Sequence, residues 1–123
     1  MRAWSPFILW ALVIFIGSSV PGNEVPGPVS QVSIVLHVSE YAVLACLAYR
    51  AFASWWPFNT FRAAWYTAFI CVVYSVTDEM HQIFVPGRHA DAHDLIADAA
   101  GILIGVAGWY WYQRLFTGKP SHR

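Results

Sequence analysis

The strongest constraint on the fold is a series of four apolar segments, each about as long as a membrane-spanning helix. Such a helix needs roughly 20 mainly apolar residues. We predict spans over residues 3–20, 30–54, 61–85 and 92–116. Proline and glycine lie between them, as at Pro86-Gly87, and both favour turns. The pattern predicts an all-α, polytopic membrane protein in which four transmembrane helices form an antiparallel bundle.

The composition agrees with a surface that faces lipid. The chain is 58% hydrophobic and 11% charged, whereas soluble domains carry about 25% charged residues. We expect residues 1–123 to form a single domain with the lipid bilayer as its main partner. A secretory signal is the alternative reading of the first segment, because Arg2 precedes its apolar run.

The distribution of charge predicts the orientation. Lys and Arg gather on the cytoplasmic side of membrane proteins. In the predicted bundle one side holds Arg2, Arg50, Arg62, Arg114, Lys119 and Arg123, and the other holds Arg88. Both termini are therefore predicted to be cytoplasmic. This placement accounts for the cations, so no nucleic-acid partner is expected. The acids all fall in the outer half: Glu24, Glu40, Asp78, Glu79, Asp91, Asp94 and Asp98.

Three predicted helices carry polar groups to a similar depth near the outer end. At about 1.5 Å rise per residue, His37 and Glu40 lie as deep below the outer surface as the acids that begin the fourth span. Residues three or four apart share a helix face. The third span therefore presents Asp78, His81 and Gln82 together, and this face continues through Tyr74, Cys71 and Thr67.

The fourth span is expected to turn its acids into the bundle. Asp94 and Asp98 share a stripe with Gly101, Gly105 and Gly108. Small residues four apart let helix backbones approach closely, so this stripe is predicted to face another helix. The acids on it would then point inward with the glycines.

Placing ionisable groups at membrane depth requires compensation. Inserting one charged side chain at the centre of a membrane helix costs at least about 2.5–3.5 kcal/mol, the lower of the available values. Protonation of carboxylates, pairing with Arg88 or a protonated histidine, and a bound cation would each lower this cost. Because ionisable residues within membranes are usually functional, the cluster indicates a site.

The segment 78–88, with its acidic pair, its His-Gln and its Pro-Gly-Arg turn, resembles the signature of the VanZ-like family. Asp94, Gly101 and Gly105 match the family's next helix, and His37 with Tyr41 resembles an earlier motif. One position departs from the pattern: many members carry Asn where this chain has Asp98. A carboxyl there must be neutral, paired or coordinating.

The resemblance implies a small multi-span protein of the bacterial cell membrane with a role in the cell envelope, related to teicoplanin resistance. The polar site would face the periplasm or exterior and bind or act on a lipid-linked envelope molecule or a lipophilic glycopeptide. A non-catalytic binding or accessory subunit with a structural polar network is the alternative. The oligomeric state is left open.

The residue types also suggest roles within the cluster. Histidine and carboxylates serve in acid–base chemistry and bind divalent cations, so a metal-assisted hydrolase or transferase is one hypothesis. The catalytic candidates are His37, Glu40, Asp78, His81 and Asp94. Substrate binding is assigned to Gln82, Arg88 and Glu79. A metal would be held by Asp78, His81, Asp94 and Asp98, although no standard zinc motif is present.

Overall fold

The computed structural model describes residues 2–24, 29–56 and 59–117, with the side chains of residues 24, 29–32 and 117 outside this description. These residues form four α-helices and no strand: α1 (Ser5–Ser18), α2 (Val29–Trp55), α3 (Thr60–Gln82) and α4 (Ala92–Tyr112). A 3-10 turn, Gly22–Glu24, follows α1, and a π-helical turn, Gln113–Thr117, follows α4. The all-α prediction is confirmed.

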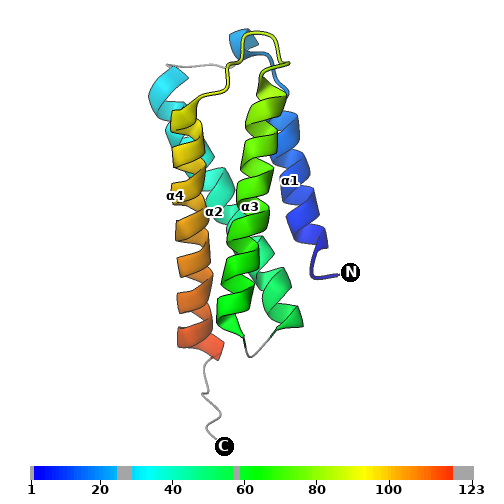
Figure 1. Cartoon of the computed structure of the whole chain (residues 1–123), viewed down its shortest axis with the longest axis vertical. Coiled ribbons are helices and arrows are strands. Elements are labelled where there is room, and N and C mark those ends of the chain that lie inside the picture. Colours follow the sequence, from blue (N-terminus) through cyan, green and yellow to red (C-terminus); the bar gives the residue numbers. More distant parts are fainter. Residues whose placement is uncertain (1, 25–28, 57–58, 118–123) are drawn as a thin grey trace, which may run out of the picture.

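Successive helices run in opposite directions along the bundle (Figure 1). The end of α1, the start of α2 and the α3–α4 loop lie at the upper end of the view. The end of α4 lies at the lower end, and α1 begins on that side but above the lower ends of the other helices. Some residues used to predict the turns and the orientation lie outside the described part of the chain, namely Pro26, Gly27, Pro28, Pro57, Lys119 and Arg123.

Local signals explain where the helices begin and end. Asn59 caps α3, because its side chain accepts a hydrogen bond from the backbone N–H of Arg62 at 2.9 Å. α3 ends at Gln82, before the predicted boundary at residue 85. The following residues instead turn toward Gly87, whose positive φ of 73° suits glycine.

The loops at the upper end touch each other. The backbone N–H of Gly22 donates to the carbonyl of Pro86 at 3.0 Å. A Cβ atom added to Gly22 would overlap the carbonyl oxygen of Gly87. The close backbone contact joins the end of α1 to the α3–α4 loop, over the half of the bundle that holds the polar cluster.

Glycines on α4 allow α2 and α4 to form the closest helix pair. Cβ atoms added at Gly101 and Gly105 would clash with backbone carbonyls of α2, those of Val38 and Ala42. The predicted small-residue stripe therefore packs against α2 through these two positions. Gly108 has open space around its Cα instead, so the close packing does not extend to it.

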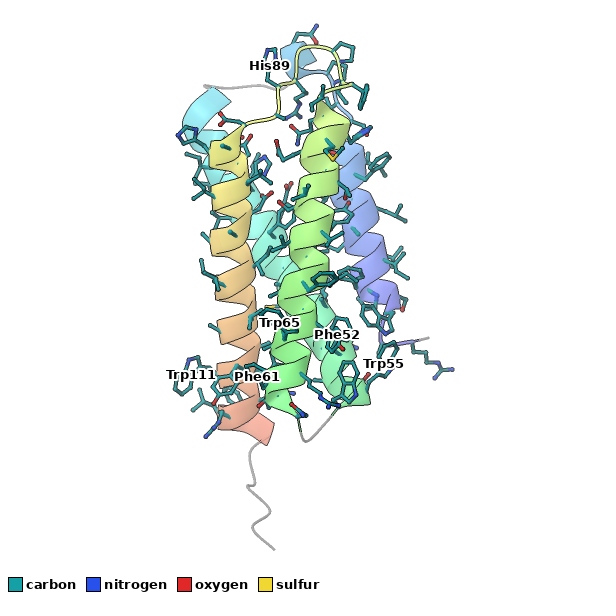
Figure 2. The ribbon with its side chains drawn as sticks, in the orientation of Figure 1. Phe52, Trp55, Phe61, Trp65, His89 and Trp111 are labelled. Atoms are coloured by element: carbon teal, nitrogen blue, oxygen red, sulfur yellow. The ribbon has the colours of Figure 1, made fainter. Side chains whose placement is uncertain are left out.

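Large apolar side chains cover the outside of the bundle (Figure 2). Leu9 of α1 is 63% exposed, Val35 of α2 65%, Phe69 of α3 62% and Leu103 of α4 70%. Soluble monomers rarely expose a continuous apolar surface of this kind. Aromatic residues, including Trp55, Phe61 and Trp111, gather toward the lower end in the figure. The exterior is therefore suited to lipid.

Two segments of the described chain are long and apolar enough to cross a membrane, judged by length and composition: Ser33–Trp55 and Ala92–Phe116. The apolar helix α1 is shorter, at 14 residues, which corresponds to about 21 Å. α3 has 23 residues but carries Arg62, Asp78 and Glu79. By length and composition, α2 and α4 are therefore the described helices best suited to cross a membrane.

Candidate functional site

Five histidine, carboxylate or amide side chains are buried in the upper half of the bundle, among the residues that the structure describes. They come from α2, α3 and α4, and are His37, Asp78, Glu79, Gln82 and Asp98. Asp98 is 1% exposed and Glu79 is 4% exposed. Burial of charged groups is unfavourable unless they are paired, so the partners of each group decide what the cluster can do.

Asp98 connects three helices through its two carboxylate oxygens. Its Oδ1 accepts a hydrogen bond from Nδ1 of His37 at 2.7 Å, which links α4 to α2. Its Oδ2 accepts from the hydroxyl of Ser75 at 2.5 Å, which links α4 to α3. A carboxylate at Nδ1 fixes the ring of a histidine and leaves Nε2 for other chemistry.

The second nitrogen of His37 faces another acid. Nε2 lies 3.7 Å from Oδ2 of Asp94, which is one turn before Asp98 on α4. The hydroxyl of Ser33 lies at 3.5 Å from Oδ1 of Asp94. Asp94 is partly exposed, so the imidazole lies between a buried carboxylate and one that reaches the upper surface. This arrangement is suited to moving a proton or holding a cation.

Glu79 points into the same group of residues. Its Oε2 accepts a hydrogen bond from the backbone N–H of Asp91 at 3.1 Å. Its Oε1 is buried and has no hydrogen-bond partner among the described residues. One donor atom from each of His37, Glu79 and Asp98 lies within 4.8 Å of the other two. The structure therefore gathers one imidazole and two carboxylates from three helices.

Asp78 occupies a neighbouring position between α3 and α1. Its Oδ1 accepts a hydrogen bond from the hydroxyl of Ser18 at 2.7 Å, and the amide of Gln82 lies 3.5 Å from its Oδ2. Asp78 is near enough to Asp98 and His37 to interact with them electrostatically. The two groups thus form one polar region, although Asp78 has its own hydrogen-bond partners.

A cavity of about 120 Å³ reaches Asp78 from the side of the bundle. Its walls are Phe15, Tyr74, Thr77, Asp78 and His81. Phe15 and Thr77 are exposed on the outer surface, so the cavity lies between α1 and α3 and not along the bundle axis. Both an aromatic ring and a buried carboxylate are accessible from it.

His81 contacts two residues at the end of α1. Its Nε2 shares a hydrogen bond with the hydroxyl of Ser19 at 3.0 Å. Its ring stacks on Phe15, with 4.6 Å between the ring centroids. The predicted metal set of Asp78, His81, Asp94 and Asp98 is thus divided between two places, and the donor atoms that converge are those of His37, Glu79 and Asp98.

Arg88 contacts the end of α1. Its Nε donates to the carbonyl of Val20 at 3.1 Å, and one of its terminal nitrogens donates to the carbonyl of Gly17 at 3.3 Å. A cation at this position adds hydrogen bonds to the last carbonyls at the C-terminal end of the helix. Glu40 is half-buried and interacts electrostatically with His37, Asp78 and Arg88.

Asp91 has a local role at the start of α4. Its carboxylate accepts hydrogen bonds from the backbone N–H and the ring Nδ1 of His93, both at 2.9 Å. The backbone bond, which is the larger cause, and the side-chain bond hold the pKa of Asp91 below its usual value. His89 lies in the exposed loop at the upper end (Figure 2).

The model of the VanZ/LLP1 family matches residues 4–114. The chain belongs to this family. Searches of the curated proteins and of the solved structures find no significant similarity. The resemblance inferred from residues 78–88 is therefore confirmed, and the chain is a VanZ-like membrane protein.

In this VanZ/LLP1 chain the residues of the 78–88 motif have separate tasks. Asp78 faces α1, Glu79 faces His37 and Asp98, and Arg88 binds the carbonyls at the end of α1. The turn at Gly87 packs against Gly22. A continuous sequence motif thus shapes both the polar region and the contact that holds α1 beside it.

Two serines of the site are absent from the sequence-based candidates. Ser75 and Ser18 bind the buried acids Asp98 and Asp78. Ser75 lies three residues before Asp78, on the same face of α3, so spacing could have identified it. Ser18 has only a weak signal, its position at the end of an apolar segment, because pairing between helices does not follow from spacing within one.

Proposed function

We propose that this VanZ/LLP1 protein crosses the cell membrane four times and binds or acts on a lipid-linked cell-envelope molecule. Both termini would be cytoplasmic, and the polar region would face the periplasm or exterior. The apolar exterior of all four helices supports this arrangement. So does the charge distribution: Arg2, Arg50, Arg62 and Arg114 lie toward the end opposite to Arg88.

The observation that carries the proposal is the buried arrangement of Asp98 between His37 and Ser75. An apolar core at these positions would hold the helices together with less desolvation. Ionisable groups at membrane depth are rare and usually mark a ligand or ion site. A histidine oriented by a carboxylate is also the general base of many hydrolytic sites.

The lateral cavity favours an amphipathic ligand. Its walls combine Phe15 and Tyr74 with the polar Asp78 and His81. Its volume of about 120 Å³ compares with about 30 Å³ per water molecule in the liquid. The cavity therefore suits a small polar group of a ligand whose apolar chain remains among the lipids. Teicoplanin, the lipophilic glycopeptide implied by the family resemblance, is also amphipathic, but only one small group of its large polar part would enter a cavity of this size.

One observation favours the second candidate, a structural network in an accessory subunit. The polar hydrogen bonds each connect different helices: Ser18 to Asp78, Ser75 to Asp98, and His37 to Asp98. Such bonds can stabilise a bundle without any ligand. This candidate predicts that their removal lowers the amount of folded protein and changes no binding constant.

A binding measurement in lipid nanodiscs tests the proposal. The probes are a polyprenyl pyrophosphate and teicoplanin, each compared with an analogue that lacks the long apolar chain. We expect saturable binding of at least one chain-bearing probe by the wild-type protein and at least tenfold weaker binding by Asp98→Asn, a change of about 1.4 kcal/mol. Ser75→Ala should also weaken binding.

A matched serine provides the control. Ser39 is on the exposed face of α2, where its hydroxyl donates to the carbonyl of Val35. Ser39→Ala should bind both probes as the wild-type protein does. Helical circular dichroism and size-exclusion chromatography identify variants that fail to fold. Folded wild-type protein that binds neither probe, or binds the short analogues equally well, would contradict the proposal.

A further inference from the structure

We propose that His37, Glu79 and Asp98 bind a divalent transition-metal ion, with Asp94 as an adjacent carboxylate. The inference rests on the proposed function only in taking the same polar region as the site. It differs from the metal set predicted from the sequence, because it replaces Asp78 and His81 with residues that the structure brings together.

The geometry of the donor atoms is close to that of a coordination site. One nitrogen of His37 and one oxygen from each of Glu79 and Asp98 lie within 4.8 Å of one another. Ligands bound to one zinc ion at about 2.0–2.2 Å cannot be more than about 4.4 Å apart. Side-chain movements of a few tenths of an ångström would bring the most distant pair into range. Oδ2 of Asp94 lies 3.7 Å from Nε2 of His37, on the other side of the ring from the contact between Nδ1 and Asp98, so Asp94 would orient the imidazole and not bind the ion.

The state of Glu79 is an independent observation that points to a ligand. The residue is 4% exposed, and its Oε1 has no hydrogen-bond partner among the described residues. Its Oε2 is held by the backbone N–H of Asp91, so the carboxylate is fixed at the start of α4. A buried oxygen without a partner is unfavourable. A cation at the point where the three donors converge would satisfy it.

The charge of the polar region favours a cation over an anion. Asp78, Glu79 and Asp98 are buried acids, and His37 is the single buried base among the described residues. Arg88 directs its guanidinium to the carbonyls at the end of α1. The buried groups thus provide more negative than positive charge, and a divalent ion would offset the excess.

The donor types select the class of metal. One imidazole with two carboxylates suits Zn²⁺ or Mn²⁺, whereas Mg²⁺ and Ca²⁺ prefer oxygen ligands alone. A bound ion of this kind can polarise a phosphate oxygen. The site would therefore accept a lipid ligand that carries a phosphate group in its polar part.

Metal binding to the purified full-length protein tests the inference directly. Detergent-solubilised protein is stripped with chelator, incubated with ZnCl₂ or MnCl₂, desalted and measured by elemental mass spectrometry. We expect about one ion per chain and a higher Tm with the metal. His37→Gln and Glu79→Gln should each bind at least tenfold more weakly and lose the Tm increase.

His81→Gln is the matched control, because His81 contacts Ser19 and Phe15 outside the donor group. It should keep the wild-type metal content. Glu79→Gln is the decisive variant, since the amide removes a buried charge and retains an acceptor for Asp91. Folded wild-type protein without metal would overturn the inference, and so would metal loss in His81→Gln with retention in Glu79→Gln.

The lipid-probe measurement separates this inference from the proposed function. Chelator-treated protein that still binds the chain-bearing probe, but takes up no Zn²⁺ or Mn²⁺, would overturn the metal site alone. Stoichiometric metal in a protein that binds no probe would contradict the proposed function alone. Both measurements start from the same batch of purified protein, in detergent for the metal content and in nanodiscs for the lipid probes.

Discussion

The two oxygens of Asp98 accept hydrogen bonds from different helices, and the side chain is almost fully buried. Many members of the VanZ-like family are expected to carry an amide at this position. An amide oxygen can replace one carboxylate acceptor, but its NH₂ group must then face the second partner. The carboxylate allows both His37 and Ser75 to donate.

The thermal stability of the protein is expected to depend on pH through Asp91. Its folded-state pKa is lowered by the hydrogen bonds from His93, so its contribution to stability is present above its unfolded pKa and is lost as the pH falls through the folded pKa. Asp91→Ala should lower Tm at neutral pH, because it removes the cap of α4. Thermal melts at pH 7 and pH 3 should show a smaller difference from wild type at pH 3.

The matched variant for this prediction is Asp91→Asn. Asparagine is also a good N-cap but has no titrating carboxylate. Its Tm should therefore stay near the wild-type value at pH 7. A difference between wild type and Asp91→Ala that grows as the pH falls would contradict the assigned role.

The spacing of residues within one helix predicted which side chains are buried. It did not predict which side chains of different helices contact each other. Thr67, Cys71 and Asp78 lie on the predicted inward face of α3 and are all buried. The contacts of Arg88 with the carbonyls at the end of α1 also did not follow from the spacing, and its role in substrate binding stays a prediction. Which groups meet depends on helix rotation and on the loops, and a single helix pattern specifies neither.

The close packing of α2 and α4 predicts opposite effects on stability for two glycine substitutions in α4. Gly101→Ala would place a methyl group against the carbonyl of Val38, and such overpacking costs about 1–3 kcal/mol. Gly108→Ala meets no atom within 4 Å. It should stabilise α4 by up to about 1 kcal/mol, because alanine is the better helix former. Unfolding by SDS, followed by circular dichroism, should show opposite signs for the two variants.

Stabilisation by Gly101→Ala would show that the helices are farther apart than the structure has them. Equal effects of the two substitutions would lead to the same conclusion. Gly105→Ala provides a further comparison, since its added methyl group would meet the carbonyl of Ala42. We expect it to behave like Gly101→Ala.

The sequence predicted the positions of the four helices well, but it predicted the residues at which they end less well. Each predicted span contains a helix, because long apolar runs and flanking Pro and Gly are strong signals. The third span was extended to residue 85, whereas α3 ends at Gln82. Apolar residues such as Val85 continue past the helix end, and hydrophobicity alone cannot distinguish a last turn from a packed loop.

The proposed orientation is tested on the whole molecule by cysteine labelling in intact cells. In a background that lacks Cys46 and Cys71, His89→Cys should react with a membrane-impermeant maleimide, because residue 89 is exposed in the α3–α4 loop. Asn59→Cys, at the opposite end of the bundle, should react only after the membrane is permeabilised. Reaction of Asn59→Cys in intact cells would contradict the orientation.

The brevity of α1 has a consequence for the membrane around the proposed four-span protein. A helix of 14 residues covers about 21 Å, while the hydrocarbon layer is about 30 Å thick. Hydrophobic mismatch of this size is relieved when the bilayer thins beside the helix. Headgroups and water would then descend locally along α1. The cavity that reaches Asp78 lies beside this helix. The protein would therefore thin the bilayer at the place where a substrate headgroup must enter.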